Sequence, residues 1–85
     1  FVLKQNYPNP FSGSTTIDYV LPGSGDVQVS VRDLLGRQVF RSPQGLQHEG
    51  EHSVQVDLQN LEAGVYFYTV SFNGMEQTRK MILSK

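Results

Sequence analysis

Residues 48–52, His-Glu-Gly-Glu-His, are the part of the chain that comes nearest to a catalytic motif. They match the H-E-x-x-H pattern of zinc metalloproteases, in which residues i and i+4 of a helix share a face, so that both imidazoles reach one metal. Here Gly50 interrupts the pattern, and turn and strand signals flank it. In an extended chain the two histidines would stand about 13 Å apart, at roughly 3.3 Å per residue. With no third ligand evident, we predict no metal site here.

Carboxylate side chains are the second group that could do chemistry, as acid–base pairs or as calcium ligands. None falls in a D-x-D-x-D-G loop, and most occupy solvent-facing strand positions or turn starts. They are Asp18, Asp26, Asp33, Asp57, Glu62 and Glu76. The Ser- and Gly-containing stretches 12–14 and 23–25 lack the context of a nucleophile elbow or a phosphate loop. The sequence therefore predicts no enzyme activity and no cofactor.

Composition narrows the functional classes further. The 85 residues include no cysteine and carry a formal net charge of −1. These values exclude a disulfide scaffold and argue against a nucleic-acid binder. No apolar run approaches the roughly 18 residues that a membrane-spanning helix needs. We expect one domain over residues 1–85, with an N-terminal edge segment and loop (1–14) and a sandwich body (15–85). The start at Phe1 rather than Met favours a piece of a longer precursor.

Period-two alternation of apolar residues dominates the chain, and helical periodicity is nearly absent. Strands are expected at 16–21, 27–32, 37–41, 53–58, 65–72 and 75–83, with a short edge strand at 1–4 and the longest loop at 42–51. Turn signals separate them at 22–26, 33–36 and 73–74. About seven short strands without helices predict an all-β fold, an immunoglobulin-like antiparallel β-sandwich.

The final hairpin predicts a surface that could bind a partner. A two-residue Asn73-Gly74 loop would pair Phe67 with Lys80 and Val65 with Ile82, leaving an apolar cluster bordered by Lys80 on the outer face. The inner face would hold Tyr66, Tyr68, Val70, Phe72, Met81 and Leu83. An exposed apolar patch commonly marks a binding surface, although cover by a neighbouring strand or loop, or ordinary apolar exposure, explains it at least as well.

Two details of this hairpin have structural consequences. The simple register turns Gln77 and Arg79 inward, so we expect the tip to overhang the core or to carry a bulge. Gly64 and Tyr66 resemble a tyrosine corner, in which a buried phenol bonds back to nearby backbone. The alternative is that Tyr66 is a plain core aromatic.

The chain closely resembles the type A C-terminal sorting domains of the type IX secretion system (the Por system) of Bacteroidota. The resemblance covers almost the whole length, through residues 3–11 (LKQNYPNPF), 14–22 (STTIDYVLP), 31–39 (VRDLLGRQV), 61–68 (LEAGVYFY) and 78–83 (TRKMIL). Two departures affect local packing only: Ser12-Gly13 stands where the family often has Asn-Pro, and Arg32 where a Tyr is common.

The resemblance implies a secretion signal rather than an enzyme. In the family, the domain directs a cargo protein from the periplasm across the outer membrane, and a sortase-like peptidase then removes it near its N-terminal edge during surface attachment or release. The implied partners are the type IX translocon, outer-membrane shuttle proteins, the peptidase and a covalently attached upstream cargo domain. The implied location is the periplasm in transit, then the outer-membrane surface or the extracellular space. The alternative function is a generic immunoglobulin-like accessory or carbohydrate-binding module of a secreted enzyme.

The resemblance also assigns candidate site residues. The late motifs of the family map onto Gly64, Tyr66, Lys80, Met81 and Leu83, and Phe67 and Ile82 complete the expected recognition or signal motif. These residues either contact the secretion machinery or serve only to fold the domain. The N-terminal motif consists of Tyr7, Pro8, Asn9, Pro10 and Phe11, which the prolines predict to be rigid and extended. Its aromatics either clamp the N-terminal segment onto the sandwich, or the motif simply covers an open end of the core.

Overall fold

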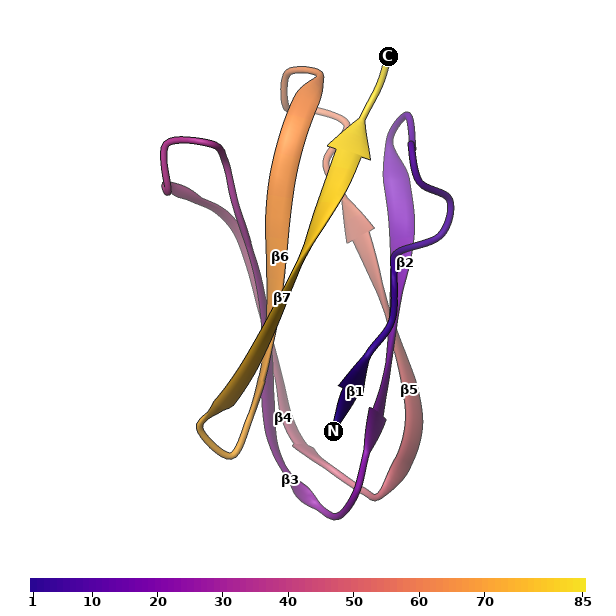
Figure 1. Ribbon diagram of the computed structural model, residues 1–85, viewed down its shortest axis with the longest axis vertical. Coiled ribbons are helices and arrows are strands. Elements are labelled where there is room, and N and C mark those ends of the chain that lie inside the picture. Colours follow the sequence, from indigo (N-terminus) through magenta and orange to yellow (C-terminus); the bar gives the residue numbers. More distant parts are fainter.

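Seven strands in two antiparallel sheets form the structure, a computed structural model that describes residues 1–85 (Figure 1). One sheet has the order β1-β2-β5 and the other β4-β3-β6-β7. The strands are β1 (Val2–Leu3), β2 (Ser14–Leu21), β3 (Gly25–Arg32), β4 (Gln38–Gln47), β5 (Gly50–Asp57), β6 (Gly64–Phe72) and β7 (Met75–Leu83). The predicted all-β, immunoglobulin-like sandwich is confirmed. No helix suited to crossing a membrane is present.

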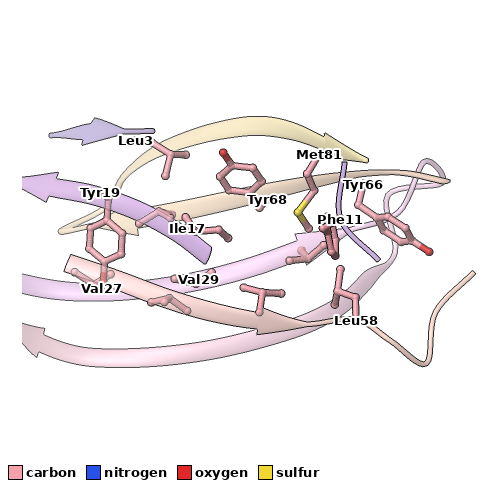
Figure 2. Packing of buried hydrophobic residues seen from close by; sticks show 14 of the residues in the cluster. Leu3, Phe11, Ile17, Tyr19, Val27, Val29, Leu58, Tyr66, Tyr68 and Met81 are labelled. Carbon is pink, nitrogen blue, oxygen red and sulfur yellow. The ribbon is translucent and has the colours of Figure 1, made fainter. Parts of the chain in front are cut away.

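The core lies between the two sheets and follows the period-two pattern of the sequence. Alternate residues of β2, β3, β5 and β6 point inward, because successive side chains of a strand face opposite sides of the sheet. Val27, Val29 and Val31 of β3 are buried, and they belong to a cluster of 17 buried apolar residues (Figure 2). Tyr19 and Tyr68 are the largest side chains that are fully buried. Both phenols carry a hydroxyl group that must find a partner inside the sandwich.

The two predicted hairpin turns form as the sequence indicates. Between β3 and β4, Asp33 Oδ1 accepts hydrogen bonds from the amides of Leu35 and Arg37, each at 2.9 Å. Between β6 and β7, Asn73 has φ 48° and Gly74 φ 85°. Two successive positive φ values are the signature of a type I′ turn, whose twist matches the flanking strands. The expected register follows, with Phe67 opposite Lys80 and Val65 opposite Ile82.

The prediction of a long loop at 42–51 is wrong, because β4 continues to Gln47 and β5 already begins at Gly50. The register of β4 shifts between the partners of Val27 and Gln28, which leaves Gln44 as an extra residue in a bulge. Pro43 fits because β4 is an edge strand, where a missing N–H costs no ladder bond. The second half of β4 is not predicted as a strand from the sequence, because it is rich in polar residues and contains a proline.

Of the two alternatives expected for the β6–β7 hairpin, an overhanging tip or a bulge, the bulge is absent, since all nine residue pairs follow one register. Gln77 and Arg79 do lie on the inner side, where they bind the free edge of β1. Gln77 Oε1 accepts from the Leu3 amide at 3.0 Å, and Arg79 Nε donates to the Leu3 carbonyl at 2.8 Å. Gln77 Nε2 also donates to the Phe1 carbonyl at 2.6 Å. These polar side chains satisfy backbone groups that an edge strand leaves unpaired.

Candidate recognition surface

The two aromatic residues of the N-terminal motif have opposite environments. Phe11 is 2% exposed and belongs to the core, whereas Tyr7 is 79% exposed. The Phe11 amide donates to the Ile82 carbonyl at 3.0 Å, and the Phe11 carbonyl accepts from the Ser84 amide at 2.7 Å. Phe11 therefore attaches the N-terminal segment to the last strand, while the side chain of Tyr7 remains free.

The prediction that this motif is extended is wrong, because residues 8–10 form a bend between two short bridges. The peptide bonds before Pro8 and Pro10 are both cis. Two buried polar side chains hold the bend. Asn6 Nδ2 donates to the Pro8 carbonyl at 3.2 Å, and the Thr15 hydroxyl donates to the same carbonyl at 2.9 Å. The proline pattern alone does not reveal these two partners.

Tyr68 binds the N-terminal segment from the opposite sheet, a role that sequence reasoning missed. Its hydroxyl donates to the Lys4 carbonyl at 2.7 Å and accepts from the Asn6 amide at 2.9 Å. Burial raises the pKa of Tyr68, and the Asn6 hydrogen bond and the charge of Arg79 only partly oppose that shift. The sequence gives only one indication of this role, the inward position of the Tyr68 phenol in β6. A buried hydroxyl requires a hydrogen-bond partner, but the sequence does not say which one.

Tyr66 forms the expected tyrosine corner. Its ring is buried and its hydroxyl donates to the Glu62 carbonyl at 2.6 Å, four residues upstream. Burial raises the pKa of this phenol, and the negative charges of Glu62 and Asp33 raise it further. The corner fixes the loop that leads from Asp57 to β6, so Gly64 starts its strand from a defined position.

The recognition residues predicted on the terminal hairpin divide between its two faces. Met81 and Leu83 are buried in the core, so a partner cannot contact their side chains while the domain stays folded. On the outer face, Phe67 is half-buried, whereas Lys80 and Ile82 are exposed. The predicted grouping of outward side chains is therefore present in the folded domain, and the inward residues serve the core.

A shallow groove of about 220 Å³ continues this outer face toward the β3–β4 turn. The turn and residues 62–66 line it from two sides. Arg37 Nε donates to Asp33 Oδ2 at 2.8 Å across the base of the turn. Desolvation alone would raise the pKa of Asp33, but the hydrogen bonds from Arg37 and Leu35, together with the Arg37 charge, lower it. Asp33 therefore serves as a turn cap that stays ionised.

Residues 48–52 do not form the helix that an H-E-x-x-H zinc site requires. They comprise the short β4–β5 turn and the start of β5. His52 stacks on Tyr19, with ring centroids 5.6 Å apart, and its Nε2 lies 2.7 Å from the His48 carbonyl oxygen. No cluster of three or more metal-ligating side chains occurs in the structure.

Comparison with known proteins identifies the family. The family model described as the secretion system C-terminal sorting domain matches residues 5–84, a range that includes both predicted motifs in full. No curated protein matches the chain at the level required for significance. The family is that of type IX secretion, as the sequence resemblance indicated, and a sorting signal of this kind is not catalytic. The chain belongs to the secretion system C-terminal sorting domain family.

Proposed function

We propose that this domain directs an upstream cargo protein across the outer membrane through the type IX secretion system. The family match over residues 5–84 carries this conclusion, because it spans the sandwich from the N-terminal motif to the end of β7. A sorting domain of this system implies export to the cell surface or the extracellular space. The domain passes through the periplasm, contacts the translocon and an outer-membrane shuttle protein, and is then removed by a sortase-like peptidase.

Residues 1–85 act in this proposal as one sorting domain, with residues 1–14 as its N-terminal edge and residues 15–85 as its body. The hydrogen bonds from Tyr68, Gln77 and Arg79 to the N-terminal segment support this view. The N-terminal motif, from Tyr7 to Phe11, fixes the position of the chain that leads to the cargo. The peptidase thereby meets its cleavage site at a reproducible distance from the folded body.

The signal residues take two roles. The outward side chains of Val65, Phe67, Lys80 and Ile82 contact the secretion machinery. The residues Gly64, Tyr66, Met81 and Leu83 hold the hairpin in the shape that is recognised. Burial of Met81 and Leu83 and the tyrosine corner at Tyr66 support this division.

A reporter fusion tests the proposal. Residues 1–85 are fused behind a reporter that carries a Sec signal, in a host with a functional type IX system. We expect the intact fusion to reach the cell surface or the medium, and the fusion that lacks residues 75–85 to remain in the periplasm. The double variant Lys80→Ala/Phe67→Ala should also remain periplasmic while its circular dichroism spectrum stays that of the folded domain.

Retention of the intact fusion in the periplasm would overturn the proposal and favour an accessory module instead.

The surface of the domain gives less support to the alternative function, a carbohydrate-binding accessory module. Sugar sites usually present aromatic rings to the ligand, and Tyr7 is the one largely exposed aromatic side chain. Binding of the purified domain to polysaccharide, with loss on Tyr7→Ala, would be the corresponding positive result.

A further inference from the structure

The outer face of the four-stranded sheet carries a row of cations that flanks an aromatic ring. Arg32 of β3 lies opposite Phe67 of β6, and Phe67 lies opposite Lys80 of β7. Because neighbouring strands stand about 4.8 Å apart, the backbones of the two cations are roughly 10 Å apart with the ring between them. Arg41 of β4, opposite Ser30, adds a third cation in the adjacent row. We use the name basic row for the three cations Arg32, Arg41 and Lys80 together with the Phe67 ring between them, although Arg41 lies one residue pair further along the sheet.

No acidic side chain neutralises the basic row. The two ion pairs of the structure are Lys4–Glu51 and Arg37–Asp33, so all three cations of the row lack a carboxylate partner. The acidic residues of the same face, Asp26 and Glu76, lie near the opposite end, beside the β6–β7 turn. A chain with a net charge of −1 thus concentrates positive charge on one part of one sheet. Unpaired cations gathered on one patch favour an anionic partner.

The basic row borders apolar surface of the hairpin and a groove whose lining also includes the charged side chains of Asp33, Arg37 and Glu62. Val65 and Ile82 form the next outward pair beside Phe67, and Val65 also lines the groove at the β3–β4 turn. On the far side of that groove, Leu34 and Leu35 are 68% and 79% exposed. Exposed apolar side chains that continue one another over a groove mark an interaction site more strongly than single ones.

We propose that the basic row and the adjoining groove bind an acidic, apolar polypeptide segment of a protein partner. The carboxylates of that segment would pair with Arg32 and Lys80, and its apolar side chains would cover Phe67 and enter the groove beside Leu35. An anionic lipid surface fits less well, because Phe67 is half-buried in the sheet and cannot insert deeply. A continuous anionic surface would also meet Glu62 at the groove and Glu76 on the sheet, whereas a peptide can place its carboxylates beside the cations alone.

This inference rests on the proposed function and names the chemistry of the partner. The reporter fusion therefore separates the two. We expect the variant Arg32→Gln/Lys80→Gln, which keeps most of each side-chain stem, to reduce export about tenfold, the effect of losing about 1.4 kcal/mol of binding. The control Gln55→Glu/Gln59→Glu changes the net charge by the same amount at exposed positions in β5 and in the loop after it, outside the four-stranded sheet that carries the basic row. It should be exported like the unmodified fusion.

The outcomes are distinguishable. If the unmodified fusion is not exported, the proposed function fails. If it is exported and Arg32→Gln/Lys80→Gln is exported equally well, the basic row is not a binding surface and only this inference is overturned. Thermal unfolding of the purified variants shows whether both double variants remain folded, and a surface role requires that they do.

A binding measurement with defined probes tests the chemistry of the partner directly. The purified domain is titrated into a fluorescein-labelled peptide with Glu residues flanking Leu-Phe pairs, and fluorescence anisotropy is followed. We expect binding that weakens about tenfold in Arg32→Gln/Lys80→Gln and in Phe67→Ala. Two control peptides, one with Lys in place of Glu and one with Ser in place of Leu and Phe, should bind the unmodified domain no more tightly than the original peptide binds the variants. Equal affinity for all three peptides, or preference for phosphatidylglycerol vesicles, would overturn the assignment of a polypeptide partner.

Discussion

The terminal hairpin and the N-terminal segment lie at neighbouring edges of the two different sheets, yet they are held in different ways. Strands β6 and β7 pair through nine consecutive residues around one tight turn. The N-terminal segment, residues 1–13, contains only the two-residue strand β1 and two isolated bridges. Side chains of Tyr68, Gln77 and Arg79 supply much of what fixes it.

This difference between backbone pairing and side-chain hydrogen bonds indicates where the domain is sensitive to single substitutions. A backbone ladder has many equivalent bonds, so no one side chain determines whether the hairpin forms. The N-terminal segment depends on a few specific groups, one of them the hydroxyl of Tyr68. Because these bonds join residues more than 60 positions apart, they add stability only when the whole sandwich is assembled.

The largest effect should follow from removing the aromatic anchor of the segment. Phe11→Ala deletes a buried ring, and we expect it to lower the free energy of unfolding by about 3–5 kcal/mol, as for other buried aromatic residues. Urea-induced unfolding measures this loss. Met81→Ala, at a buried position of the hairpin, should cost about 2–5 kcal/mol and serves as the reference. A cost below about 1 kcal/mol for Phe11→Ala would show that the segment is peripheral to the fold.

Removing one oxygen atom should loosen the segment and spare the hairpin. Tyr68→Phe leaves the Lys4 carbonyl and the Asn6 amide without their partner, which should cost about 2 kcal/mol. Hydrogen exchange should accelerate at the Asn6 amide, while amides of β6 and β7 stay protected. Tyr66→Phe is the matched control, because it breaks only the bond to Glu62 and should leave Asn6 protected. Equal acceleration in the hairpin would remove the distinction between the two regions.

Alkaline pH should weaken the domain through its buried phenols. Burial raises the pKa of Tyr19, Tyr66 and Tyr68, the first of which also donates to Gln47. In the unfolded chain these phenols ionise near pH 10, so above that value the folded state retains protons that the unfolded state has lost. Stability should be fully present below about pH 10 and fall as pH rises further toward the folded pKa values.

Urea unfolding at a series of alkaline pH values, followed with tyrosinate absorbance, measures this dependence. The decline should be shallower in Tyr68→Phe, which removes one of the three buried ionisable groups. A free energy of unfolding that stays constant well above pH 10 would contradict the assigned burial of these hydroxyl groups.

The smallest effect is expected at the other aromatic residue of the N-terminal motif. Tyr7→Ala should change the free energy of unfolding by less than about 0.5 kcal/mol, as for most exposed positions. The backbone bonds between Tyr7 and Thr16, at 2.9 Å in each direction, do not need the side chain. Thermal unfolding of this variant beside Phe11→Ala compares the two rings of one motif. A loss as large as that of Phe11→Ala would show that the phenol of Tyr7 packs on the domain in solution.

The parts of the fold that could be predicted from the sequence are those set by neighbouring residues. Asn73 and Gly74 determine the turn, and the turn then sets the register of every pair in the hairpin. The tyrosine corner is similarly local, since the hydroxyl of Tyr66 reaches a carbonyl four residues away. The outward grouping of Phe67 with Lys80 is predictable for the same reason, because counting outward from the turn is enough to pair them.

The parts that could not be predicted depend on partners distant in the chain. The second half of β4 looks like a loop because Pro43 is acceptable only where the strand lies at a sheet edge, which local sequence does not reveal. Gln77 and Arg79 look misplaced on an inner face until the free edge of β1 is placed against them. The basic row could not be predicted for a similar reason, since only the order of the strands brings Arg32 beside Phe67.

The attachment of Phe11 to Leu83 and Ser84 has a consequence for biosynthesis. A ribosome delivers Phe11 long before it delivers the strand that receives it, so the first residues of the domain wait for the last ones. A nascent or prematurely terminated chain that ends before residue 82 cannot form the backbone bonds that join Phe11 to the last strand and to Ser84. The finished shape thus reports that translation has run to the end of the domain, and machinery that reads this shape would leave incomplete polypeptides behind.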